Sequence, residues 1–106
     1  MFIIEGTTIK LTRGDSAEFD INIFDAGGNP YELQEGDKVE FTVKANVYTD
    51  KILIQKTGTH IIILPEDTTS LSYYKYVYDV QITLHDGTVD TIIPPSTFEV
   101  LSEVTF

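Results

Sequence analysis

The sequence has 106 residues, of which 42% are hydrophobic, and its seventeen acidic and seven basic side chains give a net charge of −10. This length and composition indicate one globular domain, 1–106, with a packed core, and exclude a disordered chain. The charge argues against nucleic acid and anionic membranes as partners, and the absence of cysteine excludes a disulfide, a thiolate nucleophile and a Cys-ligated zinc site.

The first six residues, 1–6, are predicted to form a leading strand or an N-terminal arm. Phe2, Ile3 and Ile4 are apolar, and Gly6 ends the run. The stretch lacks the basic region and the long apolar run of a signal peptide. No apolar run in the sequence approaches the ~20 residues that a membrane-spanning helix needs. We therefore expect neither a signal peptide nor a membrane anchor.

Short alternating stretches, separated by turn residues, follow one another along the rest of the chain. In 17–23, for example, Ala17, Phe19 and two isoleucines alternate with polar residues, which predicts a half-buried strand. Further strands are predicted at 7–12, 38–44, 52–57, 60–64, 76–84, 89–93 and around 98–104. About eight strands at a spacing of ~10 residues are typical of a β-sandwich.

The most regular strand, 76–84, follows a polar crossing that contains Pro65 and Asp67. Tyr76 and every second residue after it are apolar, whereas Val77 lies on the other face with polar neighbours. In sandwich corners of this kind a Tyr hydroxyl bonds back to upstream backbone, so we expect this of Tyr76. We expect one helical turn near 67–71 with Asp67 as its cap, and Pro94 and Pro95 to end strand pairing.

Several turn motifs resemble functional ones. The tripeptide 13–15, Arg-Gly-Asp, spells an adhesion motif, but turn chemistry explains it and predicts a turn between strands. Asp20 with Asn22, and Asp25 with Asn29, are the best candidates for calcium ligands. The full D-x-[DN]-x-[DN]-G loop is absent, so a solvated acidic surface is the expected reading.

Candidates for catalysis and metal binding lack partners in the sequence. His60 and His85 lie near turns without a third ligand pattern such as H-E-x-x-H. Asp67 has no second carboxylate at a defined spacing, as acid–base work on a glycosidic bond requires. Phosphate loops, nucleophile elbows and dinucleotide fingerprints are absent. We therefore predict no enzymatic activity, no cofactor and no catalytic or metal-binding residues.

The tyrosines suggest an alternative function. Rings at Tyr31, Tyr48 or Tyr73, if exposed on a concave face, would suit a carbohydrate-binding β-sandwich. Most aromatic residues at alternating positions belong to a core or to a protein interface instead. The feature that separates the two readings is whether these rings lie flat on one surface.

Three segments, read in their order along the chain, are distinctive. They are 11–21 (LTRGDSAEFDI), 36–44 (GDKVEFTVK), and 64–68 (LPEDT) followed by 76–80 (YVYDV). The pattern is completed near the end of the chain by the segment DGTVDTII at 86–93, with FEV at 98–100 and EVT at 103–105. Together they resemble the immunoglobulin-like β-sandwich module of phage and prophage tail proteins in Gram-positive bacteria, such as the N-terminal domain of the siphophage baseplate upper protein. Where that family has Gly before the Tyr-x-Tyr-Asp strand, this chain has Tyr74 and Lys75.

The resemblance implies an all-β fold, an immunoglobulin-like antiparallel β-sandwich of about 7–8 strands. It implies a non-enzymatic role, in which the module attaches a fibre or receptor-binding protein to the tail or baseplate. The expected partners are other tail and baseplate proteins, and a homo-oligomer is one arrangement it allows. The expected location is the virion, or the bacterial cytoplasm when a prophage is expressed.

An assembly module needs a surface for its partner. Free strand edges pair with other chains, and exposed apolar patches mark partner sites. We predict such a surface at the N-terminal arm and on the Val77 side of the central strand, with Phe2, Ile3, Ile4 and Val77 as the interaction residues.

Overall fold

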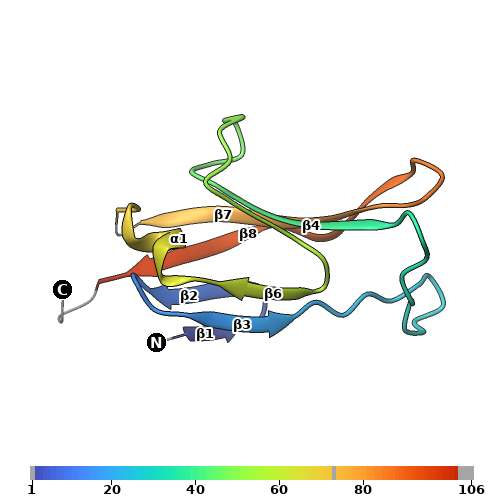
Figure 1. Ribbon diagram of the computed structural model, residues 1–106, viewed down its shortest axis with the longest axis horizontal. Coiled ribbons are helices and arrows are strands. Elements are labelled where there is room, and N and C mark those ends of the chain that lie inside the picture. The colour runs from blue at the N-terminus through green and yellow to red at the C-terminus, as the bar shows by residue number, and fades with distance from the viewer. Residues whose placement is uncertain (1, 73, 103–106) are drawn as a thin grey trace.

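The chain forms two β-sheets that pack face to face in the computed structural model, which describes residues 2–72 and 74–102 (Figure 1). One sheet has six strands in the order β1-β2-β8-β7-β4-β5, and the other pairs β3 with β6. The bounds are β1 Phe2–Glu5, β2 Thr8–Thr12, β3 Ala17–Asp20, β4 Lys38–Lys44, β5 Ile54–Thr57, β6 His60–Ile63, β7 Lys75–Thr83 and β8 Val89–Leu101. The prediction of an all-β sandwich of about eight strands is confirmed.

The strand order is that of an immunoglobulin-like sandwich. β8, β7, β4 and β5 lie side by side, as strands G, F, C and C′ do in the variable-type fold, while β3 and β6 occupy the places of B and E opposite them. Neighbours pair antiparallel except β2 and β8, which pair in parallel with Ile9 opposite Phe98. β1 and β2 form a hairpin, and β2 lies beside the last strand, β8, and runs in the same direction.

The core consists of side chains that alternate inward from both sheets. On β4 the burial pattern is strictly alternating, with Val39, Phe41 and Val43 fully buried. The Phe41 ring lies 5.2 Å from that of Tyr78 and 6.4 Å from that of Phe98, centroid to centroid. It also meets Phe19 of the small sheet edge to face at 5.7 Å. Phe41 therefore joins the two sheets at the centre of the domain.

Strand β3 ends earlier than predicted. The expected strand reached residue 23, but regular pairing stops at Asp20, which lies opposite His60 at the start of β6. Beyond this pair β6 offers no partner, because the chain there turns back through Gly58 into β5 of the other sheet. Ile21 and Ile23 stay buried, and the Ile21 amide still bonds the Thr59 carbonyl oxygen.

The prediction that Pro94 and Pro95 end strand pairing is wrong. β8 runs through both prolines as one strand of thirteen residues. The register with β7 shifts at this point, since Tyr78 lies opposite Ser96 and Val80 lies opposite Ile93. The two prolines thus occupy a bulge, where no ladder hydrogen bond from their nitrogens is needed.

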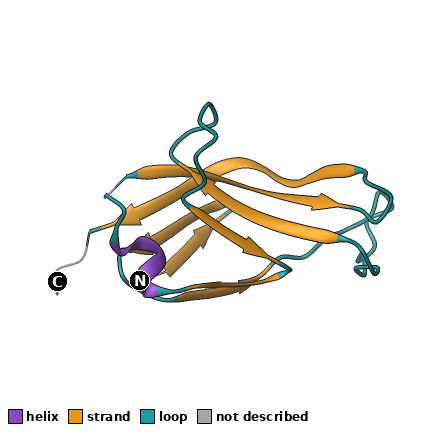
Figure 2. Cartoon of the chain, turned by 45° about the horizontal axis from the view of Figure 1, so that its top comes forward, coloured by secondary structure: helices purple, strands orange, loops and turns teal. Residues whose placement is uncertain are grey.

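The crossing from β6 to β7 begins with the short helix α1, Pro65–Thr69, at one end of the sandwich (Figure 2). The Asp67 carboxylate accepts a hydrogen bond from the Leu64 amide at 2.7 Å and pairs with the Lys56 ammonium group at 2.8 Å. The turn predicted at 13–15 packs against this crossing, because the Gly14 amide donates to the buried Thr68 hydroxyl at 2.9 Å. The crossing is therefore bound to β5 through Lys56 and to the turn at 13–15 through Gly14.

The end of the crossing is closed by Tyr76. Its ring is buried, and its hydroxyl donates to the Ser72 carbonyl oxygen at 3.0 Å. This is the backward bond of a tyrosine corner. The bond connects the start of β7 to the segment that precedes this strand.

Replacing Tyr76 with phenylalanine is expected to lower the free energy of unfolding by about 1 kcal/mol, because the Ser72 carbonyl loses its partner while ring packing stays. Urea denaturation of both proteins measures the difference. Tyr48→Phe is the matched control, since Tyr48 is 93% exposed. Equal stability of the two variants would show that the corner bond contributes nothing.

Candidate functional site

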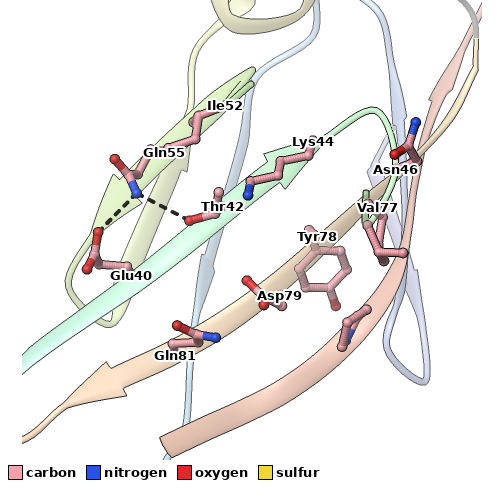
Figure 3. Close-up of a pocket in the computed structure, with 12 residues that line it drawn as sticks. Glu40, Thr42, Lys44, Asn46, Ile52, Gln55, Val77, Tyr78, Asp79 and Gln81 are labelled. Carbon is pink, nitrogen blue, oxygen red and sulfur yellow. Dashed lines mark hydrogen bonds between the residues drawn. The ribbon is translucent and has the colours of Figure 1, made fainter. Parts of the chain in front are cut away.

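The outer face of the six-stranded sheet is hollowed over β4, β5 and β7. A pocket of about 320 Å³ opens there, beside the bulge of β8 (Figure 3). Its lining includes Thr42, Lys44, Gln55, Val77, Asp79 and Gln81. The predicted interaction residue Val77 is thus part of a concave surface that mixes polar and apolar side chains, rather than of a continuous apolar patch.

Strand register brings these side chains together. In β4 and β7 every second residue is buried, so the residues between them point away from the core. The pairing places Thr42 opposite Asp79 and Lys44 opposite Val77, across two strands that are distant in sequence. Figure 3 shows Val77, Asp79 and Gln81 along one strand and the side chains of β4 beside them.

Several polar side chains that line the pocket form hydrogen bonds with one another. The Gln55 amide nitrogen donates to the Glu40 carboxylate at 3.0 Å and to the Thr42 hydroxyl at 3.3 Å (Figure 3). Burial raises the pKa of the Asp79 carboxyl, and the nearby Lys44 charge acts in the opposite direction. The Asp79 carboxyl is therefore partly shielded from water within the chain itself.

The N-terminal strand β1 forms one edge of the same sheet. It pairs with β2 on one side and, within the described residues, with no strand on the other. Phe2 lies opposite the buried Leu11, and its ring stacks on that of Phe19 at 5.7 Å. Ile4 lies opposite Ile9 and is 47% exposed. The side chain of Ile3, also predicted as an interaction residue, lies outside what the structure describes.

At the opposite end of the sandwich, a buried carboxylate ties two loops together. Asp37 accepts hydrogen bonds from the Tyr31 hydroxyl at 2.6 Å, the Gln34 amide at 2.9 Å and the His85 amide at 2.9 Å. The Tyr31 hydroxyl, followed by these amides, holds the pKa of Asp37 well below its usual range. Sequence patterns did not predict this cluster, and the turn Gly36-Asp37 ahead of a strand was the one signal that pointed to it.

The tyrosines of the carbohydrate-binding alternative are not gathered on one surface. Tyr31 is half-buried and its hydroxyl is bound to Asp37. Tyr48 is exposed in the loop that joins β4 to β5, which projects at the top of Figure 1, far from the loop that contains Tyr31. Tyr73 lies outside the described residues. The geometry does not favour this alternative.

The remaining candidates are bound within the chain. His60 lies between two carboxylates of β3, 2.9 Å from Glu18 and 2.7 Å from Asp20, and the hydrogen bond to Asp20 is the main cause of its raised pKa. The Asp25 carboxylate, considered above for calcium, accepts hydrogen bonds from the Gly27 and Asn29 amides of its own turn. Both groups therefore have local structural roles.

The described part of the chain also lacks a cluster of metal ligands and a membrane-spanning helix. Over residues 2–72 and 74–102, no group of three or more His, Asp or Glu side chains is placed to hold a metal ion. In the same part of the chain, no helix is long and apolar enough to cross a membrane. Comparison of the sequence with known proteins found no matching family model and no matching curated protein.

Proposed function

We propose that this chain is a non-enzymatic interaction module of a phage or prophage tail, which attaches a fibre or receptor-binding protein to the tail or baseplate. The order of the strand and turn segments, LTRGDSAEFDI, GDKVEFTVK and LPEDT with YVYDV, supports this role. The immunoglobulin-like strand order agrees with it. In this role the protein belongs to the virion and its partners are other tail proteins.

The observation that carries the proposal is the edge of β1 that faces away from β2, where no other strand of residues 2–72 and 74–102 pairs with it. A strand edge with unpaired amides and carbonyls is a template for another strand. Natural proteins commonly protect such edges with inward-pointing charges, prolines or a covering loop. Here the inward-pointing residues are the apolar Phe2 and Ile4, and Ile4 is 47% exposed.

We infer the character of the partner segment from the side chains at this edge. Phe2 and Phe19 stack where the two sheets meet, so the flank between β1 and β3 is lined by aromatic rings that are half-buried. A strand that extends the sheet past β1 places every second side chain over this flank. The partner segment is therefore an extended one with apolar residues at alternate positions, and basic residues elsewhere in it would complement the net charge of −10.

A photoreactive benzoylphenylalanine at position 4 tests this docking in a culture that produces the particles. We expect irradiation to link the chain to a tail, baseplate or fibre protein, identified by mass spectrometry. The same group at position 48, on a loop tip that is 93% exposed, is the control for random encounters. Equal products at the two positions, or products with cytoplasmic enzymes at position 4, would contradict the proposal.

A further inference from the structure

A histidine lies between two carboxylates on the outward face of the small sheet. Asp20 of β3 lies opposite His60 of β6, and Glu18 points to the same face because it is two positions from Asp20. The Nε2 atom of His60 lies 2.9 Å from a carboxylate oxygen of Glu18, and its Nδ1 atom lies 2.7 Å from one of Asp20. The imidazole ring therefore bridges the two carboxylates.

The two contacts are satisfied together only when both ring nitrogens carry a proton. A neutral imidazole has one N–H donor and one acceptor nitrogen, whereas an imidazolium has two donors, and an ionised carboxylate only accepts. With a neutral ring, one of the two carboxylates would face the lone pair of a ring nitrogen at hydrogen-bond distance. The arrangement is therefore that of the imidazolium form, which donates one charge-assisted hydrogen bond to Glu18 and one to Asp20.

His60 is the one basic residue of the two strands that form the small sheet. The turn that precedes it, 58–59, carries no charge, and Lys56 of β5 is paired with Asp67 instead. The hydrogen bond to Asp20 is the largest cause that raises the pKa of His60 above its ordinary value of 6.5. Partial desolvation acts in the opposite direction, and the charges of the two carboxylates add to the rise. The surroundings therefore favour the protonated ring.

One end of the small sheet depends on this contact. The sheet has two strands and four residue pairs, and Asp20 with His60 is the pair at this end. Beyond it the Ile21 amide still donates to the Thr59 carbonyl oxygen at 2.7 Å. Two-stranded sheets are marginally stable alone, and cross-strand pairs contribute to their stability. When the ring loses its proton, it loses one of its two hydrogen bonds and leaves two carboxylates without a cation, so this end of the sheet is weakened.

We propose that His60 is a pH-sensitive switch in the small sheet: its imidazolium form keeps the end of β3 paired with β6, and its deprotonation opens this end while the six-stranded sheet stays folded. The stabilisation is fully present below pH 6.5, the ordinary pKa of histidine, and is lost as the pH rises through the raised pKa of the folded protein. The six-stranded sheet keeps its core, because Glu18, Asp20 and His60 all point outward from the other sheet. The switch acts within one chain and is independent of docking at β1.

Amide hydrogen exchange, measured by NMR from about pH 5 to 9 and corrected for intrinsic exchange rates, tests this proposal. We expect the protection of the Ile21 amide and its neighbours in β3 and β6 to fall about two- to fivefold as His60 titrates, the effect of losing one cross-strand pair. Amides between β4 and β7 should keep their protection. Histidine ring signals in the same samples give the titration midpoint of His60, and the variant His85→Gln identifies which of the two histidine signals belongs to His60.

Three variants separate the switch from a general effect of pH. His60→Gln, which never carries a charge, should show the lower protection at every pH, and His60→Lys, which carries one throughout, should show no step. In the double variant Glu18→Gln with Asp20→Asn, the titration midpoint of His60 should be lower than in the unmodified chain. An unchanged midpoint in the double variant, or the same pH dependence of protection in His60→Gln as in the unmodified chain, would overturn the proposal. Circular dichroism melting curves establish that each variant is folded.

Discussion

Replacing Phe41 with alanine is expected to lower the free energy of unfolding by about 3–5 kcal/mol, the range for large-to-small changes in a close-packed core. Phe41 has no exposed surface and contacts rings from both sheets. Removing its ring leaves a cavity between Phe19, Tyr78 and Phe98, whose positions are fixed by three different strands. Because such a cavity cannot collapse easily, we expect the loss near the upper end of this range.

Urea denaturation followed by circular dichroism measures this effect. Domains of this size have total stabilities of about 5–15 kcal/mol, so the variant is expected to unfold at much lower urea concentrations. Phe41→Leu, which retains much of the volume, should lose less, and Tyr48→Ala should lose almost nothing. A loss below about 1 kcal/mol for Phe41→Ala would mean that the two sheets do not meet at this ring.

The second large effect is expected at Asp37. Asp37→Ala leaves the Tyr31 hydroxyl and the Gln34 and His85 amides without their acceptor, and the carboxylate they surround has no exposed surface. Buried donors that lose their acceptor cost more than a typical hydrogen bond contributes. We expect the melting temperature to fall by roughly 10 °C.

The pH dependence of stability reports on the same carboxylate. Because the folded protein lowers the pKa of Asp37 below its ordinary value of 3.8, ionised Asp37 stabilises the fold at all pH values above about 4. As the pH falls below 4, the unfolded chain takes up the proton first, so this contribution shrinks, and it is fully lost once the folded protein is protonated as well. The stability difference between the unmodified chain and Asp37→Asn should therefore be constant from about pH 5 to 7 and shrink toward pH 2.

Urea denaturation at a series of pH values provides this measurement. His60 has the opposite sign, since its raised pKa contributes stability that is lost as the pH rises above its folded value. Comparing Asp37→Asn with the unmodified chain at each pH cancels the His60 contribution. A difference that grows toward pH 2 would contradict the assignment of Asp37 as a stabilising ionised group.

The regular strands could be predicted because apolar and polar residues alternate along them, as buried and outward-facing residues do in the structure. β4 and β7 have the predicted limits to within one residue, and the outward position of Val77 follows from the same alternation. The end of β3 and the course of β8 could not be predicted, because both depend on where a partner strand starts or shifts its register. Two prolines are tolerated in β8 because of the bulge, which local sequence does not reveal.

The candidate surfaces were predictable to a smaller extent. An apolar N-terminal segment is compatible with an edge strand, but only the sheet order shows that β2 is its one neighbour among the described strands. The Asp37 cluster joins residues that are 6 and 48 positions apart, so no short motif identifies it. His60 and Asp20 are 40 positions apart, and strand pairing alone brings them together on the small sheet.

Quantitative mass spectrometry of purified tail particles from the organism that encodes this chain is the most direct test of the proposed function. We predict that the chain is present in a fixed ratio to the other tail proteins. Ile4→Asp, which places an inward-pointing charge on the β1 edge, should fold and yet be absent from the particles. The control is Ile62→Asp, at a residue of β6 in the small sheet that is 45% exposed, and this variant should be incorporated. Absence of the unmodified chain from the particles would contradict a tail role, and incorporation of Ile4→Asp in full amount would contradict docking at β1.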